Sequence, residues 1–124
     1  MKKAVIVVGS HFAGKSKTIN VHVKKKLKIK PQAHKFNLKG KDGYILSQSF
    51  EEAERDVSYV IKKYGHYDLL VLAARPAHET PSDLNKAIKQ LTAKGFKVYT
   101  VPVNAEQKES YYSSKADDVI KKLS

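Results

Sequence analysis

The sequence predicts an α/β protein, a three-layer sandwich with a mostly parallel sheet of four to five strands. Two nearly continuous apolar runs, residues 4–8 and 68–73, are typical of parallel strands that are covered on both faces. Amphipathic helical patterns separate these runs, and the alternation of strand and helix favours parallel pairing through right-handed crossovers. The chain has 124 residues, the usual size of one domain, so we expect residues 1–124 to form a single domain.

The first half of the chain continues this pattern after its opening strand. An amphipathic helix is predicted over about residues 15–27, because apolar side chains recur there at four-residue spacing, and Pro31 ends it. Two short strands are then expected at residues 34–38 and 44–46, with a hairpin turn at Asp42-Gly43 between them.

The middle of the chain predicts a helix followed by a buried strand. Ser49 and Glu52 match the S-x-x-E capping box, which predicts a helix that starts here and ends at Gly65. The apolar strand at residues 68–73 follows, and Arg75-Pro76 ends it.

The last third predicts two further helices around one strand. Thr80 with Pro81 at the first helical position indicates a helix start, and Gly95 ends that helix. A strand is expected at residues 96–103, and the last helix at about residues 114–123.

Composition limits the classes of function. The net charge of +12 comes from 24 basic and 12 acidic side chains and favours polyanionic partners. Only two of the basic residues are arginines, which disfavours sequence-specific reading of DNA bases. The chain has no cysteine and no apolar run near the roughly 20 residues of a membrane span. Its opening MKKAVIVVG is interpreted as a strand rather than a leader, so we expect a cytoplasmic protein without a membrane partner.

The octapeptide GSHFAGKS, residues 9–16, has the spacing G-x-x-x-x-G-K-S. It resembles the P-loop, or Walker A motif, of P-loop nucleoside triphosphatases and kinases. A buried strand leads into the octapeptide and an amphipathic helix leaves it, which is the context that this motif requires. A structural glycine turn in a lysine-rich protein is the alternative interpretation.

The residue types in this motif suit a phosphate site. Gly9 and Gly14 can adopt backbone angles closed to other residues, so that successive N–H groups converge on one anion. Lys15 adds a mobile positive charge that would reach the outer phosphates, and the Ser16 hydroxyl would bind magnesium. The predicted nucleotide-binding residues are Gly9, Ser10, His11, Phe12, Ala13, Gly14, Lys15, Ser16 and Lys17.

The resemblance also implies a second motif, an apolar strand ending in an aspartate that holds magnesium through water. The second apolar strand lacks it, because its one acid, Asp68, lies at the start and Ala73 or Ala74 occupies the expected position. If this strand neighbours the first, Arg75 lies near the loop, and Lys15 and Arg75 are the candidates for catalysis. The departure bears on hydrolysis more than on binding.

Three other features are each open to two interpretations. Gln48 would either orient a water or be a simple loop residue. Tyr111 and Tyr112 follow the last strand, where members of the superfamily often contact the base, so one would stack on a purine or both would pack at an edge. The lysine-rich run at residues 24–30 would bind nucleic acid or only solvate its helix.

The sequence therefore predicts a small P-loop protein that binds ATP with magnesium and carries out phosphoryl transfer or slow hydrolysis. The expected ligand is ATP or another purine nucleotide, and ATP is preferred to GTP because the chain has no N-K-x-D guanine motif. Two alternatives remain: a non-catalytic sensor of phosphate or nucleotide, and a basic nucleic-acid-binding module.

Overall fold

The computed structural model of the chain describes residues 2–10, 14–48, 50, 56–78 and 82–124. The elements in chain order are β1 (Lys2–Val8), α1 (Lys15–Lys17), η1 (Thr18–Val23), α2 (Lys24–Lys26), β2 (Lys35–Leu38), β3 (Lys41–Ile45), α4 (Val57–Tyr64), β4 (Leu69–Ala74), α5 (Leu84–Ala93), β5 (Phe96–Pro102) and α6 (Glu109–Leu123). Because α1, the π-helical η1 and α2 follow one another without a break, they are together called the first helix, residues 15–26.

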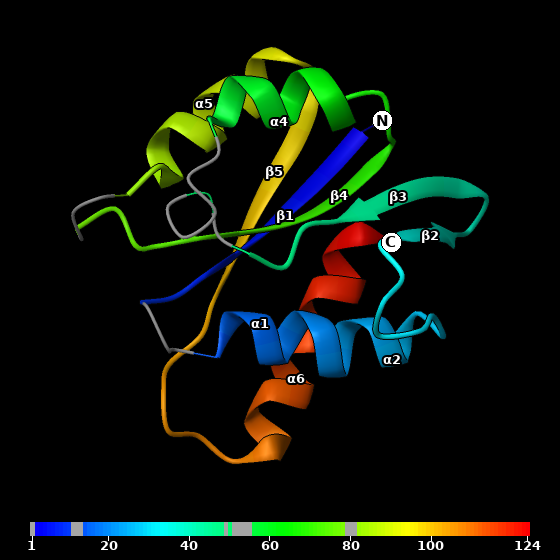
Figure 1. The fold of residues 1–124 in the computed structure, drawn as a ribbon, viewed down its shortest axis with the longest axis vertical. Helices are drawn as coiled ribbons and strands as arrows, with labels where there is room; N and C mark the ends of the chain where they lie inside the picture. Colours follow the sequence, from blue (N-terminus) through cyan, green and yellow to red (C-terminus); the bar gives the residue numbers. More distant parts are fainter. Residues whose placement is uncertain (1, 11–13, 49, 51–55, 79–81) are drawn as a thin grey trace.

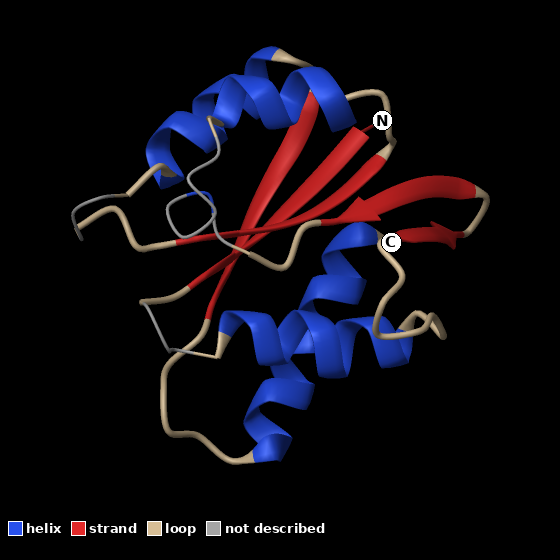
Figure 2. Cartoon of the chain, in the orientation of Figure 1, coloured by secondary structure: helices blue, strands red, loops and turns tan. Residues whose placement is uncertain are grey.

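The strands form one five-stranded sheet in the order β2-β3-β4-β1-β5 (Figure 2). All neighbouring strands are parallel except β2, which is antiparallel to β3. The predicted α/β class and mostly parallel sheet are confirmed. In the register, Val8 at the end of β1 lies beside Ala74 of β4 and Pro102 of β5, so three strands end together at one edge of the sheet.

Helices cover both faces of this sheet: α4 and α5 lie on one face, and the first helix and α6 on the other (Figure 1). Successive strand residues point to opposite faces, and the buried side chains accordingly form two clusters. The cluster beneath α4 and α5 includes Ala4, Ile6, Val8, Leu70, Leu72, Val60 and Leu91. The cluster beneath the first helix and α6 includes Val5, Val7, Val71, Ile19, Val23, Ala116 and Val119.

The hairpin forms as predicted, but the predicted turn at Asp42-Gly43 is wrong. These two residues lie inside β3, and the turn is at Lys39 and Gly40, whose φ angles of 53° and 82° suit a tight hairpin turn. Gly43 instead faces Phe36 across the hairpin, and a Cβ at Gly43 would overlap the Phe36 ring. The glycine is therefore needed to make room for an aromatic ring, not to make a turn.

The last helix begins at Glu109, five residues earlier than the predicted start near residue 114. The segment ESYYSS, residues 109–114, has modest helix propensity, and the predicted start of this helix is therefore too late. Tyr112 is buried within this first part of α6, and its packing outweighs the propensity.

The other helix ends agree partly with the sequence. The Asp56 carboxylate accepts a hydrogen bond from the Ser58 N–H at the start of α4, and Gly65 ends α4 as predicted. Gly95, with φ of +92°, follows the end of α5. The predicted helix-start residues Ser49, Glu52, Thr80 and Pro81 lie outside the described residues, but both predicted starts are too early for α4 and α5. Asp56 is extended, with φ of −69° and ψ of 134°, so α4 begins only at Val57, and α5 begins only at Leu84. None of the helices described is both long and apolar enough to cross a bilayer.

Candidate functional site

The loop after β1 starts beside β4 and ends at the first helix. The Gly9 N–H donates to the Ala74 carbonyl over 3.1 Å, which ties the start of the loop to the end of β4. Gly14 at the other end is left-handed, with φ of 93° and ψ of 18°, and caps the first helix. Because side chains destabilise this conformation, a glycine is required here, as the motif predicts. His11, Phe12 and Ala13 lie outside the described residues.

The Lys15 side chain folds back over the loop. It is 4% exposed, and its ammonium donates to the Gly9 carbonyl over 2.5 Å and to the Ser10 carbonyl over 2.9 Å. The two carbonyl oxygens supply the hydrogen-bond partners that a buried ammonium needs and hold it at the loop. Phosphate oxygens are stronger acceptors than carbonyls, so this ammonium is suited to transfer its hydrogen bonds to an anion.

Thr18 fixes the left-handed glycine from within the helix. Both its N–H and its hydroxyl Oγ1 donate to the Gly14 carbonyl, each over 2.9 Å, and the residue is fully buried. These two hydrogen bonds satisfy the Gly14 carbonyl at the turn into the helix.

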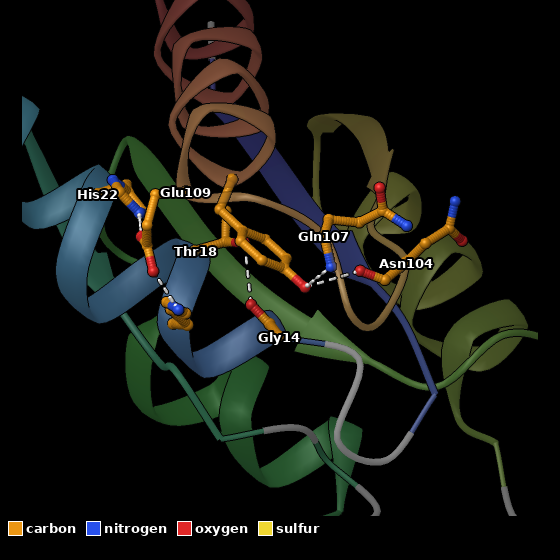
Figure 3. A network of polar contacts seen from close by, with 8 residues as sticks. Gly14, Thr18, His22, Asn104, Gln107 and Glu109 are labelled. Carbon is orange, nitrogen blue, oxygen red and sulfur yellow. Dashed lines mark hydrogen bonds and ion pairs between the residues drawn. The ribbon is translucent and has the colours of Figure 1, made fainter.

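Tyr112 of α6 lies against the same glycine. A Cβ built at Gly14 would lie 2.6 Å from the Tyr112 Cε1 atom. The Tyr112 hydroxyl donates to the Asn104 carbonyl over 3.0 Å and accepts from the Gln107 N–H over 3.3 Å (Figure 3). One side chain thus joins the glycine to the loop between β5 and α6.

An acidic residue at the start of α6 holds the outer side of the first helix. The Glu109 carboxylate pairs with the Lys17 ammonium and, over 2.8 Å, with the His22 Nε2 atom (Figure 3). The hydrogen bond from Lys17, and then that from His22, lowers the pKa of Glu109 below its ordinary value. Glu109 therefore stays ionised, and α6 is fastened to the first helix beside the loop.

Three further predicted binding residues among those described are exposed at the loop and the start of the first helix. Ser10, Ser16 and Lys17 are exposed. The Ser16 hydroxyl, the predicted magnesium ligand, donates to the Ser47 carbonyl over 3.4 Å, which places it beside the loop after β3.

The structure places β4 next to β1, so Arg75 follows directly after the residue that binds the Gly9 N–H. Arg75 is half-buried, and its carbonyl accepts a hydrogen bond from the Ser82 hydroxyl over 2.9 Å. Ala73 and Ala74 occupy the strand end where a carboxylate was sought. Within the described part of the chain, no three His, Asp or Glu side chains gather as a metal cluster.

The tyrosines and the glutamine that the sequence singled out pack against other parts of the protein. Tyr112 is 4% exposed, which leaves no free ring face for a purine. Tyr111 is half-buried with its ring edge-on to Tyr112, and its hydroxyl accepts from the Asn104 N–H over 3.0 Å. Gln48 lines a cavity of about 10 Å³ on the α4 side of the sheet.

The lysine-rich run at residues 24–30 is not a uniform basic surface. Lys24 is 2% exposed and donates to the Pro31 carbonyl over 2.7 Å, and burial lowers its pKa. Lys26 pairs with Asp117 of α6 over 2.7 Å. Lys24 and Lys26 therefore make contacts within the fold and do not belong to a row of fully solvated charges.

A cleft of about 730 Å³ lies between α4 and α5, at the opposite edge of the sheet from the glycine loop. Its lining includes Lys2, Lys62 and Lys94, yet the C-terminal ends of both helices flank it. Such ends carry partial negative charge, and the Lys2 ammonium already donates to the Gly65 carbonyl over 2.5 Å. The Lys2 ammonium thus already serves a helix end, and the negative ends of two helices make the cleft poorly suited to phosphate.

No family profile, curated protein or solved structure matches this chain. The site is therefore defined by its own geometry. Sequence reasoning found Gly9, Gly14 and Lys15 through their spacing. It considered Tyr112 only as a partner for the base or as an edge residue, and it missed Glu109 and the contact of Tyr112 with Gly14. No local pattern marks contacts between segments so far apart in the chain.

Proposed function

We propose that this chain binds the phosphates of a purine nucleoside triphosphate, with ATP preferred, at residues 9–17. The single observation that carries the proposal is the position of the buried Lys15 ammonium, held over the Gly9 and Ser10 carbonyls next to left-handed Gly14. This arrangement supports interpreting the octapeptide as a P-loop rather than as a plain glycine turn.

Three sources of positive potential support an anion here. The first helix runs without a break from Lys15 to Lys26 and directs its N-terminal end at the loop. The Lys15 ammonium adds a full charge in a buried setting, where charge-assisted hydrogen bonds are strongest. The net charge of +12 attracts polyanions over a longer range. The two core clusters on opposite faces of the sheet also support the three-layer arrangement in which such loops occur.

Magnesium fits this site through the nucleotide more than through the protein. Ser16 is exposed at the helix start, so its hydroxyl is available as one ligand, while Ala74 ends the neighbouring strand without a carboxylate. Mg²⁺ commonly keeps several waters and uses phosphate oxygens, and it would neutralise charge on the phosphates there. The chain's own residues bind and orient the phosphates, and Arg75 is the remaining candidate for catalysis. We therefore propose slow hydrolysis or phosphoryl transfer, with a non-catalytic sensor as the alternative.

Calorimetry with Mg·ATP and Mg·GTP tests the binding proposal. Lys15→Ala should weaken Mg·ATP binding by roughly ten- to a hundredfold, because it removes charge-assisted hydrogen bonds. Lys25→Ala is the matched control, since Lys25 is exposed on the same helix away from the loop. Equal affinities for both variants, or no heat with the unchanged protein, would contradict the proposal.

Product assays over hours separate the enzyme from the sensor. Turnover that disappears in Lys15→Ala and falls in Arg75→Ala would establish the enzyme, with Arg75 acting on a phosphate. Tight binding without product would establish the sensor. Lys15→Ala is the negative control for contaminating hydrolases.

Exposed lysines beyond the buried Lys24 favour a second candidate, a basic nucleic-acid-binding surface. Lys25, Lys28 and Lys30 are all exposed at the end of the first helix. Filter binding of a single-stranded oligonucleotide at rising salt should then show a steep loss of affinity that softens in the triple glutamine variant. Binding that is absent or insensitive to salt would dismiss this candidate.

A further inference from the structure

We propose that Tyr112 is a positioning residue that sets the shape of the phosphate loop from α6, so that the loop after β1 and the loop before α6 respond to each other. The observation behind this is the contact between the Tyr112 ring and Gly14, combined with the two hydrogen bonds of the Tyr112 hydroxyl. The proposal rests on the proposed function, because it assigns a partner to the same loop.

The ring acts on the conformation of the glycine. The three atoms nearest to the Cβ position of Gly14 are Cε1, Cζ and the hydroxyl oxygen of Tyr112, at 2.6, 3.0 and 3.1 Å. The ring thus packs against the face of Gly14 that a side chain would occupy. Since Gly14 is left-handed and holds Thr18 through its carbonyl, this contact helps to fix the turn into the first helix.

The hydroxyl fixes the ring. It bonds both the Asn104 carbonyl and the Gln107 N–H, in the loop between β5 and α6 (Figure 3). A buried tyrosine held at both ends has one position, so a shift in the loop before α6 moves the ring against Gly14.

A second contact links the same elements. The Lys17 ammonium lies 5.5 Å from the centre of the Tyr112 ring. It also pairs with Glu109, which belongs to α6 like Tyr112. The first turn of the first helix therefore meets α6 on two sides. If a bound phosphate shifts Gly14, the Tyr112 ring carries that shift to residues 104–107, and the coupling is reciprocal.

The test compares two tyrosine-to-phenylalanine variants that each remove one hydroxyl from the same loop. Tyr112→Phe keeps the ring but removes the two hydrogen bonds that fix it. Tyr111→Phe removes the acceptor of the Asn104 N–H hydrogen bond. It is the control because all three atoms nearest the Gly14 Cβ position belong to Tyr112. The probe is Mg²⁺ with inorganic triphosphate. We expect Tyr112→Phe to bind it roughly three- to tenfold more weakly, and Tyr111→Phe to bind within about twofold of the unchanged protein.

Amide chemical shifts of residues 14–18, measured without any ligand, give a second readout. Tyr112→Phe should move them and Tyr111→Phe should not, at matched thermal stability. Tyr112→Leu should weaken triphosphate binding further, and if it does not fold, the phenylalanine pair decides alone. Equal affinities for the two phenylalanine variants, or unmoved shifts in Tyr112→Phe, would overturn the proposal. If the unchanged protein binds no triphosphate, the proposed function fails, and the ligand-free shifts still decide the role of Tyr112.

Discussion

The two faces of the sheet bury similar apolar side chains but very different polar ones. Among the described residues, and apart from tyrosines, the buried polar side chains are Lys15, Thr18 and Lys24, and all belong to the first helix. On the opposite face, the polar contacts of α4 and α5 are exposed, namely Ser58 with Gln90 and Lys86 with Asp56. The free-energy cost of burying lysine and threonine side chains therefore falls on one face of the sheet.

This difference favours the face of the first helix and α6 as the location of the proposed phosphate site. Burying a polar group destabilises a protein unless each group finds a partner, so such groups collect where a role requires them. The α4 and α5 face behaves as a scaffold whose contacts are apolar or solvated. The face with the first helix and α6 holds charges and hydroxyls around the glycine loop, and each prediction below contrasts the two faces.

The largest effect on stability is expected from Gly14→Ala. The alanine must adopt a left-handed conformation, which costs about 1–2 kcal/mol, and displace the Tyr112 ring, which costs about 1–3 kcal/mol more. The midpoint temperature of thermal unfolding should therefore fall by roughly 12 °C, for a loss of about 3 kcal/mol in the free energy of unfolding.

Gly95→Ala is the matched control for the backbone term. Gly95 has φ of +92°, nearly that of Gly14, but a Cβ there meets nothing within 4 Å. It should lose only about 1–2 kcal/mol, measured by urea unfolding. Equal losses for the two variants would show that Tyr112 does not constrain Gly14.

An intermediate effect is expected from Thr18→Val, which keeps the shape of the side chain and removes its hydroxyl. Thr18 is fully buried and bonds the Gly14 carbonyl, so the loss should be about 1 kcal/mol in urea unfolding. Thr92→Val on α5 removes the same kind of bond, to the Ile88 carbonyl over 2.7 Å, but Thr92 is exposed. Water replaces that bond, and the change should stay within about 0.5 kcal/mol. A reversed order would contradict the contrast between the faces.

The smallest effect concerns two carboxylates whose pKa values lie below their ordinary values. The pKa of Glu109 is lowered by Lys17 and then His22, and that of Asp56 by Lys86 and then the Ser58 N–H. A carboxylate with a lowered folded pKa stabilises the fold at pH values above its ordinary pKa, and this contribution disappears as the pH falls through the lowered folded pKa. Glu109→Gln and Asp56→Asn should each reduce the fall in stability over that range, measured by thermal unfolding against pH.

The same pair distinguishes the faces through amide shifts. Glu109→Gln should move the amide shifts of residues 15–18, because its partner Lys17 lies in the first turn of the first helix. Asp56→Asn should leave those shifts unchanged, since Asp56 contacts Lys86 on the other face. Movement in both variants would mean that the two faces are not independent.

The sequence predicted the elements whose signals are local. The apolar runs of β1 and β4 and the glycine-rich loop between β1 and the first helix come from short patterns, and the structure places them within one or two residues. The position of Arg75 beside the loop also followed once β4 was expected to neighbour β1.

Features that depend on distant contacts could not be predicted in this way. Gly43 looked like a turn residue because the Phe36 ring that needs it lies on another strand. Lys24 looked like one surface lysine among many, although its ammonium is buried against the Pro31 carbonyl. The role of Tyr112 depends on how α6 packs, which no spacing in the sequence encodes.

The most direct test of the central claim is a titration of Mg·ATP into isotope-labelled protein, followed through backbone amide shifts. The account predicts that the amides of Gly9 and Gly14–Lys17 move and saturate together, while those of α4 and α5 stay in place. If millimolar nucleotide leaves the loop amides unmoved, or moves only the residues around the cleft between α4 and α5, the loop is not a phosphate site.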